Sequence, residues 1–219
     1  MNYQKQPKAG IRKEVLAGLL VFIGAICFSA KAVLVKLAYR YEVDSVSLLT
    51  LRMVFSLPVF LLVAWWVSRS KTSRAQPLNR RDWFYIVLFG VAGYYLASML
   101  DFIGLQYISA SMERLILFIY PTIVLVLSAL FLGKPIRREQ YVALGLTYVG
   151  ITLAFAQGMS LAGQSDFVKG AIFIFFGAFS YAIYLIGSGN LLPRLGTWRY
   201  TSLAMSAACG AIIIHHGIA

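Results

Sequence analysis

Five ionisable side chains lie within stretches of the chain that are otherwise strongly apolar: Lys31, Arg52, Asp101, Glu113 and Arg114. Side chains of these types can pair with one another, hold a charged or zwitterionic solute, or exchange a proton. A charge that faces lipid costs roughly 2.5–3.5 kcal/mol by insertion scales. We therefore expect these side chains to turn inward, where they pair or face water.

The helices that must carry these residues place three of them at one depth. At about 1.5 Å per residue, Asp101 lies about 10 Å from the turn near Ser109, and Lys31 and Arg52 reach the same layer from two other helices. Two interpretations stay open. Asp101 pairs with Lys31 or Arg52 and only locks helices together, or the three line a polar vestibule that binds solute, with Asp101 as a proton-coupling residue.

Glu113 and Arg114 lie nearer the expected membrane surface than Asp101 does. The interpretation that we favour is that both side chains, with Lys36, extend to the interface, as long charged side chains do near helix ends. The alternative gives Glu113 a role in proton coupling and Arg114 a role in solute binding.

Tyrosine and proline supply the other candidates. Packing is the more common role of aromatic residues in helices, but five tyrosines could also line a cavity: Tyr94, Tyr95, Tyr120, Tyr181 and Tyr184. Pro58 and Pro121 fall near the middle of two expected helices, where each removes an N–H and frees a carbonyl. That carbonyl needs a partner or a cavity inside a membrane, so each proline is either a packed kink or a hinge beside the site.

The composition indicates a protein solvated by lipid. Hydrophobic residues make up 60% of the 219 residues and charged residues only 13%, about half of what a soluble domain carries. The net charge of +12 comes from bases clustered between apolar stretches, which is typical of loops at lipid headgroups. Nucleic acid is excluded as a partner because no basic segment alternates with aromatic residues.

Seven apolar segments are long enough to predict an all-α polytopic membrane protein. Their approximate spans are 15–38, 46–67, 83–107, 111–132, 138–157, 169–188 and 198–218. The N-terminal tail and every second loop are basic, which by the positive-inside rule places the N-terminus in the cytoplasm. We expect a multi-pass protein of the plasma membrane, which in a bacterium is the inner membrane.

A weak internal repeat relates the first and sixth spans. A shift of 153 residues places "GAICF" from Gly24 over "GAFSY" from Gly177. Five spans separate the copies, so the second copy is inverted, as in many transporters. The chain then divides into a basic tail (1–14), a five-helix unit (15–157), a linker (158–168) and a partial second unit of two helices (169–219). We expect about three further helices to complete the second unit.

Known catalytic and cofactor motifs are absent from the sequence: it contains no G-x-S-x-G, H-E-x-x-H or Walker motif. We expect no enzyme activity, no cofactor and no metal site.

Four sequence motifs resemble those of the EamA-like permeases of the drug/metabolite transporter superfamily. They are "LTLRMVFSLP" (49–58), "GLQYISAS" (104–111), "YP" (Tyr120 and Pro121) and "LFLGKPIRREQYVALGLTYVGI" (130–151). The likeness covers most of 15–157 and, more faintly, 169–218. Lys134 departs from the family pattern, which commonly has an acid there.

The resemblance implies two inverted five-helix units around a central cavity, and secondary transport or efflux of metabolites such as amino acids, commonly coupled to protons. The excess of bases in the charged layer favours an anionic or zwitterionic solute. The alternative is a membrane protein without transport activity, either truncated or contributing helices to a larger assembly. A homodimer or a partner subunit is an open expectation in both cases.

Overall fold

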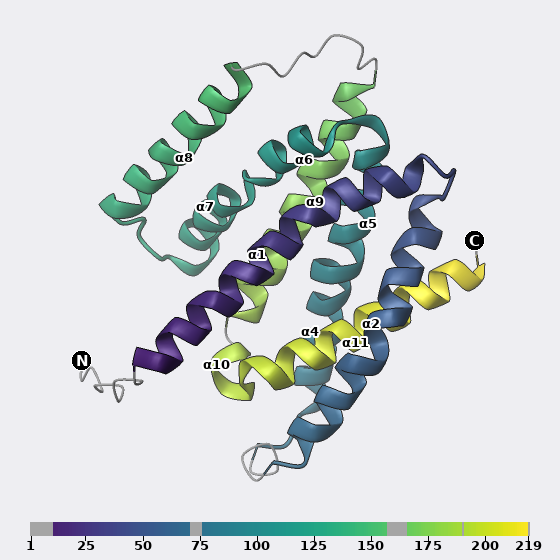
Figure 1. Ribbon diagram of the computed structural model, residues 1–219. Coiled ribbons are helices and arrows are strands. Elements are labelled where there is room, and N and C mark those ends of the chain that lie inside the picture. The colour runs from purple at the N-terminus through teal and green to yellow at the C-terminus, as the bar shows by residue number, and fades with distance from the viewer. Residues whose placement is uncertain (1–10, 71–75, 157–165, 190, 219) are drawn as a thin grey trace.

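The computed structural model describes residues 11–70, 76–156, 166–189 and 191–218, and within these ranges the chain is helical without strands (Figure 1). The elements are α1 (Ile11–Tyr39), α2 (Ser45–Ser68), α4 (Arg80–Gly90), η1 (Val91–Leu96), α5 (Ala97–Tyr107), α6 (Ala110–Leu117), α7 (Tyr120–Leu132), α8 (Arg138–Ala156), α9 (Phe167–Ser188), α10 (Leu192–Leu195) and α11 (Thr197–Ile218). The prediction of an all-α polytopic membrane protein is confirmed.

Six of the seven expected spans are helices long and apolar enough to cross a membrane within the described ranges. The expected fifth span is present as the 19-residue helix α8. It is not among the six candidates. Crossing of the membrane by α8 stays a prediction.

The third span is one continuous stretch of helix from Arg80 to Tyr107, but its middle is a π-helical turn that the sequence did not predict. In this turn the amide of Ala97 donates to the carbonyl of Ala92, one residue further back than in an α-helix. The Ser180 hydroxyl of α9 donates to the same carbonyl at 2.8 Å. The Ala92 carbonyl thus accepts from its own helix and from α9, which links the wider turn to the neighbouring helix.

The fourth span is not the single helix that the sequence predicts. It breaks at Phe118–Ile119 into α6 and α7, and Pro121 lies in the first turn of α7. A proline in a first turn removes no intrahelical hydrogen bond, so the expectation that Pro121 lies near the middle of a helix is wrong. Pro58 does lie inside α2, as expected.

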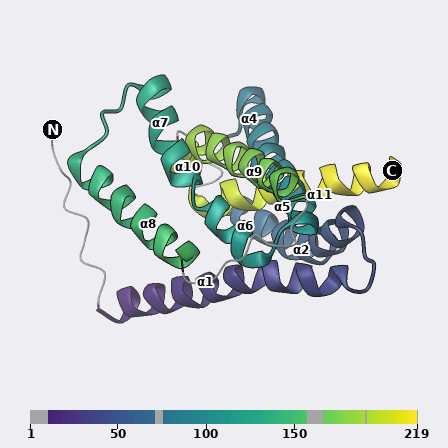
Figure 2. The same ribbon diagram turned by 90° about the horizontal axis from the view of Figure 1, so that it is seen from above.

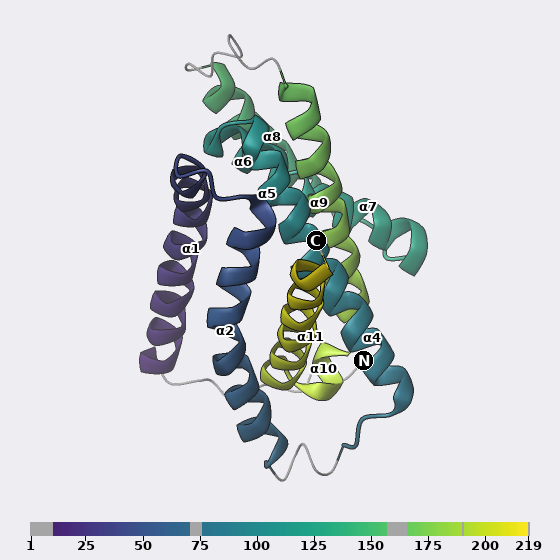
Figure 3. The same ribbon diagram turned by 90° about the vertical axis from the view of Figure 1, so that its right-hand side faces the viewer.

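The helices pack most closely around α5, α9, α2 and α11. Figures 2 and 3 show α9 beside α5, and α11 beside α2, while α1 runs along one edge of the molecule. Close approach depends on glycine: a Cβ at Gly93 would lie 2.2 Å from the Tyr184 ring, and one at Gly177 would lie 3.1 Å from the Ala97 carbonyl oxygen. These contacts fix the three helices that form one wall of the cavity described next.

Candidate functional site

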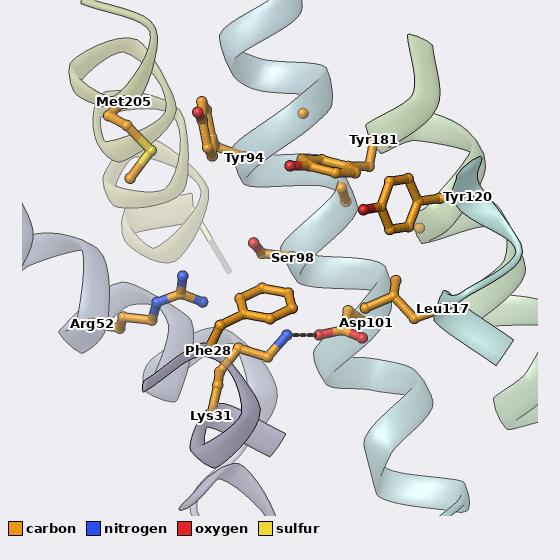
Figure 4. Close-up of a pocket in the computed structure, with 13 residues that line it drawn as sticks. Phe28, Lys31, Arg52, Tyr94, Ser98, Asp101, Leu117, Tyr120, Tyr181 and Met205 are labelled. Carbon is orange, nitrogen blue, oxygen red and sulfur yellow. Dashed lines mark hydrogen bonds and ion pairs between the residues drawn. The ribbon is translucent and has the colours of Figure 1, made fainter. Parts of the chain in front are cut away.

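A cavity of about 440 Å³ opens where the middle parts of the helices converge. Its wall is formed by Phe28 and Lys31 from α1, Arg52 from α2, Gly93, Tyr94, Ala97, Ser98 and Asp101 from η1 and α5, Leu117 and Tyr120 from the fourth span, Gly177 and Tyr181 from α9, and Met205 from α11. Figure 4 shows the charged side chains on one side of this space and the tyrosines on the other. The cavity is of the size that small-molecule sites in proteins have.

Lys31 and Asp101 form the central ion pair, which joins α1 to α5 across the cavity wall (Figure 4). The Asp101 side chain is 5% exposed and that of Lys31 is 17% exposed, so water screens the pair only partly. The second carboxylate oxygen of Asp101, Oδ1, is buried and has no hydrogen-bond partner among the described residues. Of the two pairings that the sequence left open, Asp101 with Lys31 or with Arg52, the pair with Lys31 is present, and both of its residues line the cavity.

Glu113 lies directly behind this pair. Its side chain is fully buried, with Oε1 3.7 Å from Lys31 Nζ and Oε2 3.3 Å from Arg114 Nε. Neither carboxylate oxygen has a hydrogen-bond partner in the described part of the chain. The interpretation that we favoured, in which Glu113 extends to the membrane interface, is therefore wrong: the helix turn at Ser109 directs this side chain between α1 and α5.

Arg114 is held against α1 and does not reach outward freely. Its Nη2 donates to the carbonyl of Phe28, and its guanidinium carbon lies 4.5 Å from the centre of the Phe28 ring. The side chain is 18% exposed. Arg114 thus ties the start of the fourth span to α1. Lys36 of α1 donates to the Leu105 carbonyl at 2.8 Å and so ties α1 to α5.

Arg52 differs from the other charged residues of the cavity. Its guanidinium carbon lies 5.8 Å from the centre of the Phe102 ring. No hydrogen bond or ion pair joins this guanidinium to any residue in the described ranges. The residue is exposed, and in Figure 4 the guanidinium points into the same space as Ser98.

The tyrosines form the opposite wall. Tyr120 and Tyr181 meet edge to face with ring centres 5.5 Å apart, and the Tyr94 hydroxyl is 2.7 Å from that of Tyr184. Tyr94, Tyr120 and Tyr181 therefore both pack and line the cavity, whereas packing alone was the favoured interpretation. Tyr95 points elsewhere, with its hydroxyl 2.8 Å from His215 Nδ1.

The two hinge candidates relate differently to the cavity. Pro121 follows the lining residue Tyr120 and lies just after the break between α6 and α7. Pro58 is outside the lining set, nearly two turns beyond Arg52 along α2. A hinge at either proline stays a prediction.

The sequence analysis missed Phe28 and Ser98 as lining residues. Ser98 had a usable signal: Tyr94, Ser98 and Asp101 are spaced i, i+4 and i+7, which places them on one helix face. Phe28 had the same signal, three residues before Lys31. Small polar and aromatic residues are common in helices. Their spacing therefore indicates a cavity-lining face only when a charged residue such as Lys31 or Asp101 lies on the same face.

A second charged cluster lies at the start of the third span and involves α10 and α11. Asp82 at the start of α4 is paired with Arg194 of α10, and its Oδ2 also accepts from the Asn79 amide at 2.9 Å. Arg199 of α11 donates to the Gln76 carbonyl at 2.8 Å. These contacts attach the segment before α4 to α10 and α11.

Comparison with known proteins agrees with this architecture. Residues 15–156 match the EamA-like transporter family. The chain belongs to this family. Over 218 residues it is also 29% identical to the "Uncharacterized transporter YcbK" of Bacillus subtilis (strain 168), a match that covers 100% of this chain and 68% of that protein. No solved structure matches. The resemblance read from the sequence motifs is thus confirmed, and the protein is a multi-pass membrane transporter of the EamA-like family.

Proposed function

We propose that the chain is a secondary permease that carries small metabolites, such as amino acids or related compounds, through the cavity between its helices. The observation that carries the proposal is that charged residues from three spans, Lys31, Arg52 and Asp101, meet at one cavity. Charged groups inside a membrane are costly and mark solute and ion pathways. A purely structural ion pair would not require an open space of about 440 Å³ beside it.

Proton coupling is supported by the buried carboxylate behind the cavity. Glu113 shares Lys31 with Asp101 and has no hydrogen-bond donor among the described residues. An ionised carboxylate buried in this way is costly, and proton binding to Glu113 would remove that cost. Lys31 could then turn fully to Asp101, which links protonation to the geometry of the cavity wall.

The orientation belongs to the same proposal. Bases gather at the ends of helices next to every second loop, as Arg80 and Arg81 do at the start of α4 and Arg137 and Arg138 at the start of α8, which favours a cytoplasmic N-terminus in the bacterial inner membrane. With that orientation the charged layer lies in the outer half of the membrane. Solutes would enter or leave it from outside, and the Asp82 cluster would face the cytoplasm.

The test is solute movement by the purified protein in liposomes. Uptake from a mixed pool of amino acids and related acids, followed by mass spectrometry with and without a proton gradient, identifies a transported solute and its coupling. We expect saturable uptake that responds to the gradient, and a reduction of about tenfold or more in Asp101→Asn. Asp82→Asn is the matched control and is expected to retain flux within about twofold.

Equal flux in Asp101→Asn and in the unaltered protein would mean that the solute does not pass through this cavity. Equal flux with and without the gradient would remove proton coupling but leave the permease intact.

A second candidate function is a helix-contributing subunit of a larger assembly. It is favoured by α8, which buries no residue over 138–153 and is linked to α7 through the 2.6 Å contact between the Tyr148 and Thr122 hydroxyls. Figure 1 shows α8 apart from the main group of helices. Cysteines introduced at Leu146 and Leu153, which are 69% and 60% exposed, test it: cross-linking between subunits in native membranes supports an assembly, and exclusive labelling by lipid-phase reagents contradicts it.

A further inference from the structure

Arg52 is the one cavity-lining cation without an ionic partner in the described ranges, and this sets it apart from Lys31. The residue is exposed, and the Phe102 ring beside its guanidinium offers no hydrogen-bond acceptor. A guanidinium at this position needs either water or an anion. Its planar fork of N–H donors matches a carboxylate, which it binds through two parallel hydrogen bonds.

The charges of the layer also favour one negative charge on the solute. Three cations, Lys31, Arg52 and Arg114, face two carboxylates, Asp101 and Glu113, so the ionised layer has one positive charge in excess. Asp101 is already paired with Lys31, and Glu113 is behind them and fully buried. An ammonium group entering the cavity would have to share Asp101 with Lys31, because Glu113 does not line the cavity and the one Asp101 oxygen without a hydrogen-bond partner among the described residues, Oδ1, is buried.

The wall opposite Arg52 is suited to a flat apolar body. Tyr120 and Tyr181 present an edge-to-face pair to the cavity, with Tyr94 beside them (Figure 4). The Tyr94 hydroxyl is engaged by Tyr184, which leaves the ring itself as its contact surface. Aromatic walls of this kind hold a planar group by stacked or edge-on contact.

We propose that the cavity binds a monocarboxylate with a planar apolar body, the carboxylate on Arg52 and the body among Tyr94, Tyr120 and Tyr181. An amino group on the solute is not required. This inference rests on the proposed permease function and names the solute class of its site.

The first experiment measures equilibrium binding to the unaltered protein in lipid nanodiscs by calorimetry. The probes are 3-phenylpropionate, its neutral analogue 3-phenylpropanamide, the cation 3-phenylpropylamine and the zwitterion phenylalanine. We expect the carboxylate to bind about 10- to 100-fold more tightly than the amide or the amine, the range that a charge-assisted hydrogen-bond pair supplies. Phenylalanine should bind no more tightly than 3-phenylpropionate.

The second experiment uses variants. Arg52→Gln should weaken 3-phenylpropionate binding by about tenfold or more and remove the preference over the amide, and Arg52→Lys should keep part of that preference. Arg40→Gln, an exposed arginine in the turn after α1, is the matched control and should bind like the unaltered protein. Tyr120→Ala should weaken 3-phenylpropionate and leave acetate unchanged, whereas Tyr120→Phe should retain both.

Tighter binding of the amine, or unchanged affinity in Arg52→Gln, overturns the inference. Because the probe series is measured on the unaltered protein, a variant that fails to fold does not decide the result. Saturable flux of another solute that 3-phenylpropionate does not inhibit would overturn this inference and leave the permease function standing. Absence of any flux would instead count against the permease function.

Discussion

Two charged clusters join helices, one at the cavity and one at the start of the third span, and they differ in how completely their polar atoms are paired. The cluster of Lys31, Asp101, Glu113 and Arg114 lies at the cavity, and buried carboxylate oxygens on both acids have no hydrogen-bond partner among the described residues. The cluster around Asp82 caps α4, pairs with Arg194 and is absent from the cavity wall.

The difference separates two uses of the same chemistry. In the Asp82 cluster each carboxylate oxygen has a partner. The cluster therefore holds one arrangement, and its carboxylate has no unpaired oxygen to offer to a ligand. The cavity cluster has spare acceptors that a proton or a donor group could occupy. Buried polar groups without partners are costly. A site that binds and releases a proton or a solute needs such groups beside its cavity, because they are satisfied only in the bound state. The four predictions below test this contrast.

Loss of Asp101 should produce the largest effect. Asp101→Ala leaves Lys31 half-buried with only Glu113 at 3.7 Å, and breaking a buried pair from one side costs about 3–5 kcal/mol. Unfolding by SDS in bicelles measures the free energy. The double variant Lys31→Met with Asp101→Ala should recover most of the loss, since no unpaired charge remains. A double variant less stable than Asp101→Ala would show that the pair is not the source of the cost.

Loss of Glu113 should act mainly on the pH dependence of flux. Glu113→Gln keeps the shape of the side chain but removes the carboxylate that shares Lys31 with Asp101. We expect flux under a proton gradient to fall by about tenfold, while exchange of solute for solute at equal pH continues. Flux measured from pH 5 to 9 in both proteins checks this. An unchanged pH profile in Glu113→Gln would assign coupling elsewhere.

Loss of Asp82 should lower stability and leave transport unchanged. Asp82→Ala removes the contact that caps α4 and the Arg194 pair, and loss of a helix cap costs about 0.5–2 kcal/mol. Arg194 is half exposed, so Arg194→Ala alone should cost less than about 1 kcal/mol. The same SDS titration, with flux measured in parallel, checks both. A loss of flux in Asp82→Ala that exceeds its loss of folded protein would place this cluster in the transport cycle.

The helices and the site's charges follow from the sequence because both depend on local composition. Lipid forces long apolar segments to be helical, and the cost of a buried charge points Lys31 and Asp101 inward. The start of α2 at Ser45 is within one residue of the expected segment. These features need only the order of residues along one helix.

Features that depend on contacts between helices were not accessible in this way. The π-helical turn is stabilised by Ser180 of another helix, and the burial of Glu113 depends on where α1 lies. The repeated glycines illustrate the same limit: Gly177 meets the Ala97 carbonyl oxygen, whereas a Cβ at Gly24 would meet nothing within 4 Å. The two segments that the predicted repeat aligns thus pack differently at these glycines.

The smallest predicted effect concerns Asp44, a carboxylate that caps a helix and forms no ion pair with a described residue. Its Oδ2 accepts from the amides of Val46 and Ser47, each at 3.0 Å. The interaction with Ser47, followed by that with Val46, holds the pKa of Asp44 below its ordinary value. Asp44→Ala should therefore cost about 1 kcal/mol at pH 7, and Asp44→Asn, which still caps, should cost less.

The sign of the pH dependence follows from the lowered pKa. Stabilisation by the charged form is fully present above the unfolded pKa of about 3.9. It is lost as the pH falls through the still lower folded pKa. Unfolding titrations of the unaltered protein and Asp44→Asn should converge at acid pH and differ most above pH 5. A difference that grew on acidification would mean that Asp44 stabilises α2 by something other than its charge. Because Asp44 only caps, its effect gives the scale of a purely structural carboxylate, against which the much larger effect at Asp101 can be judged.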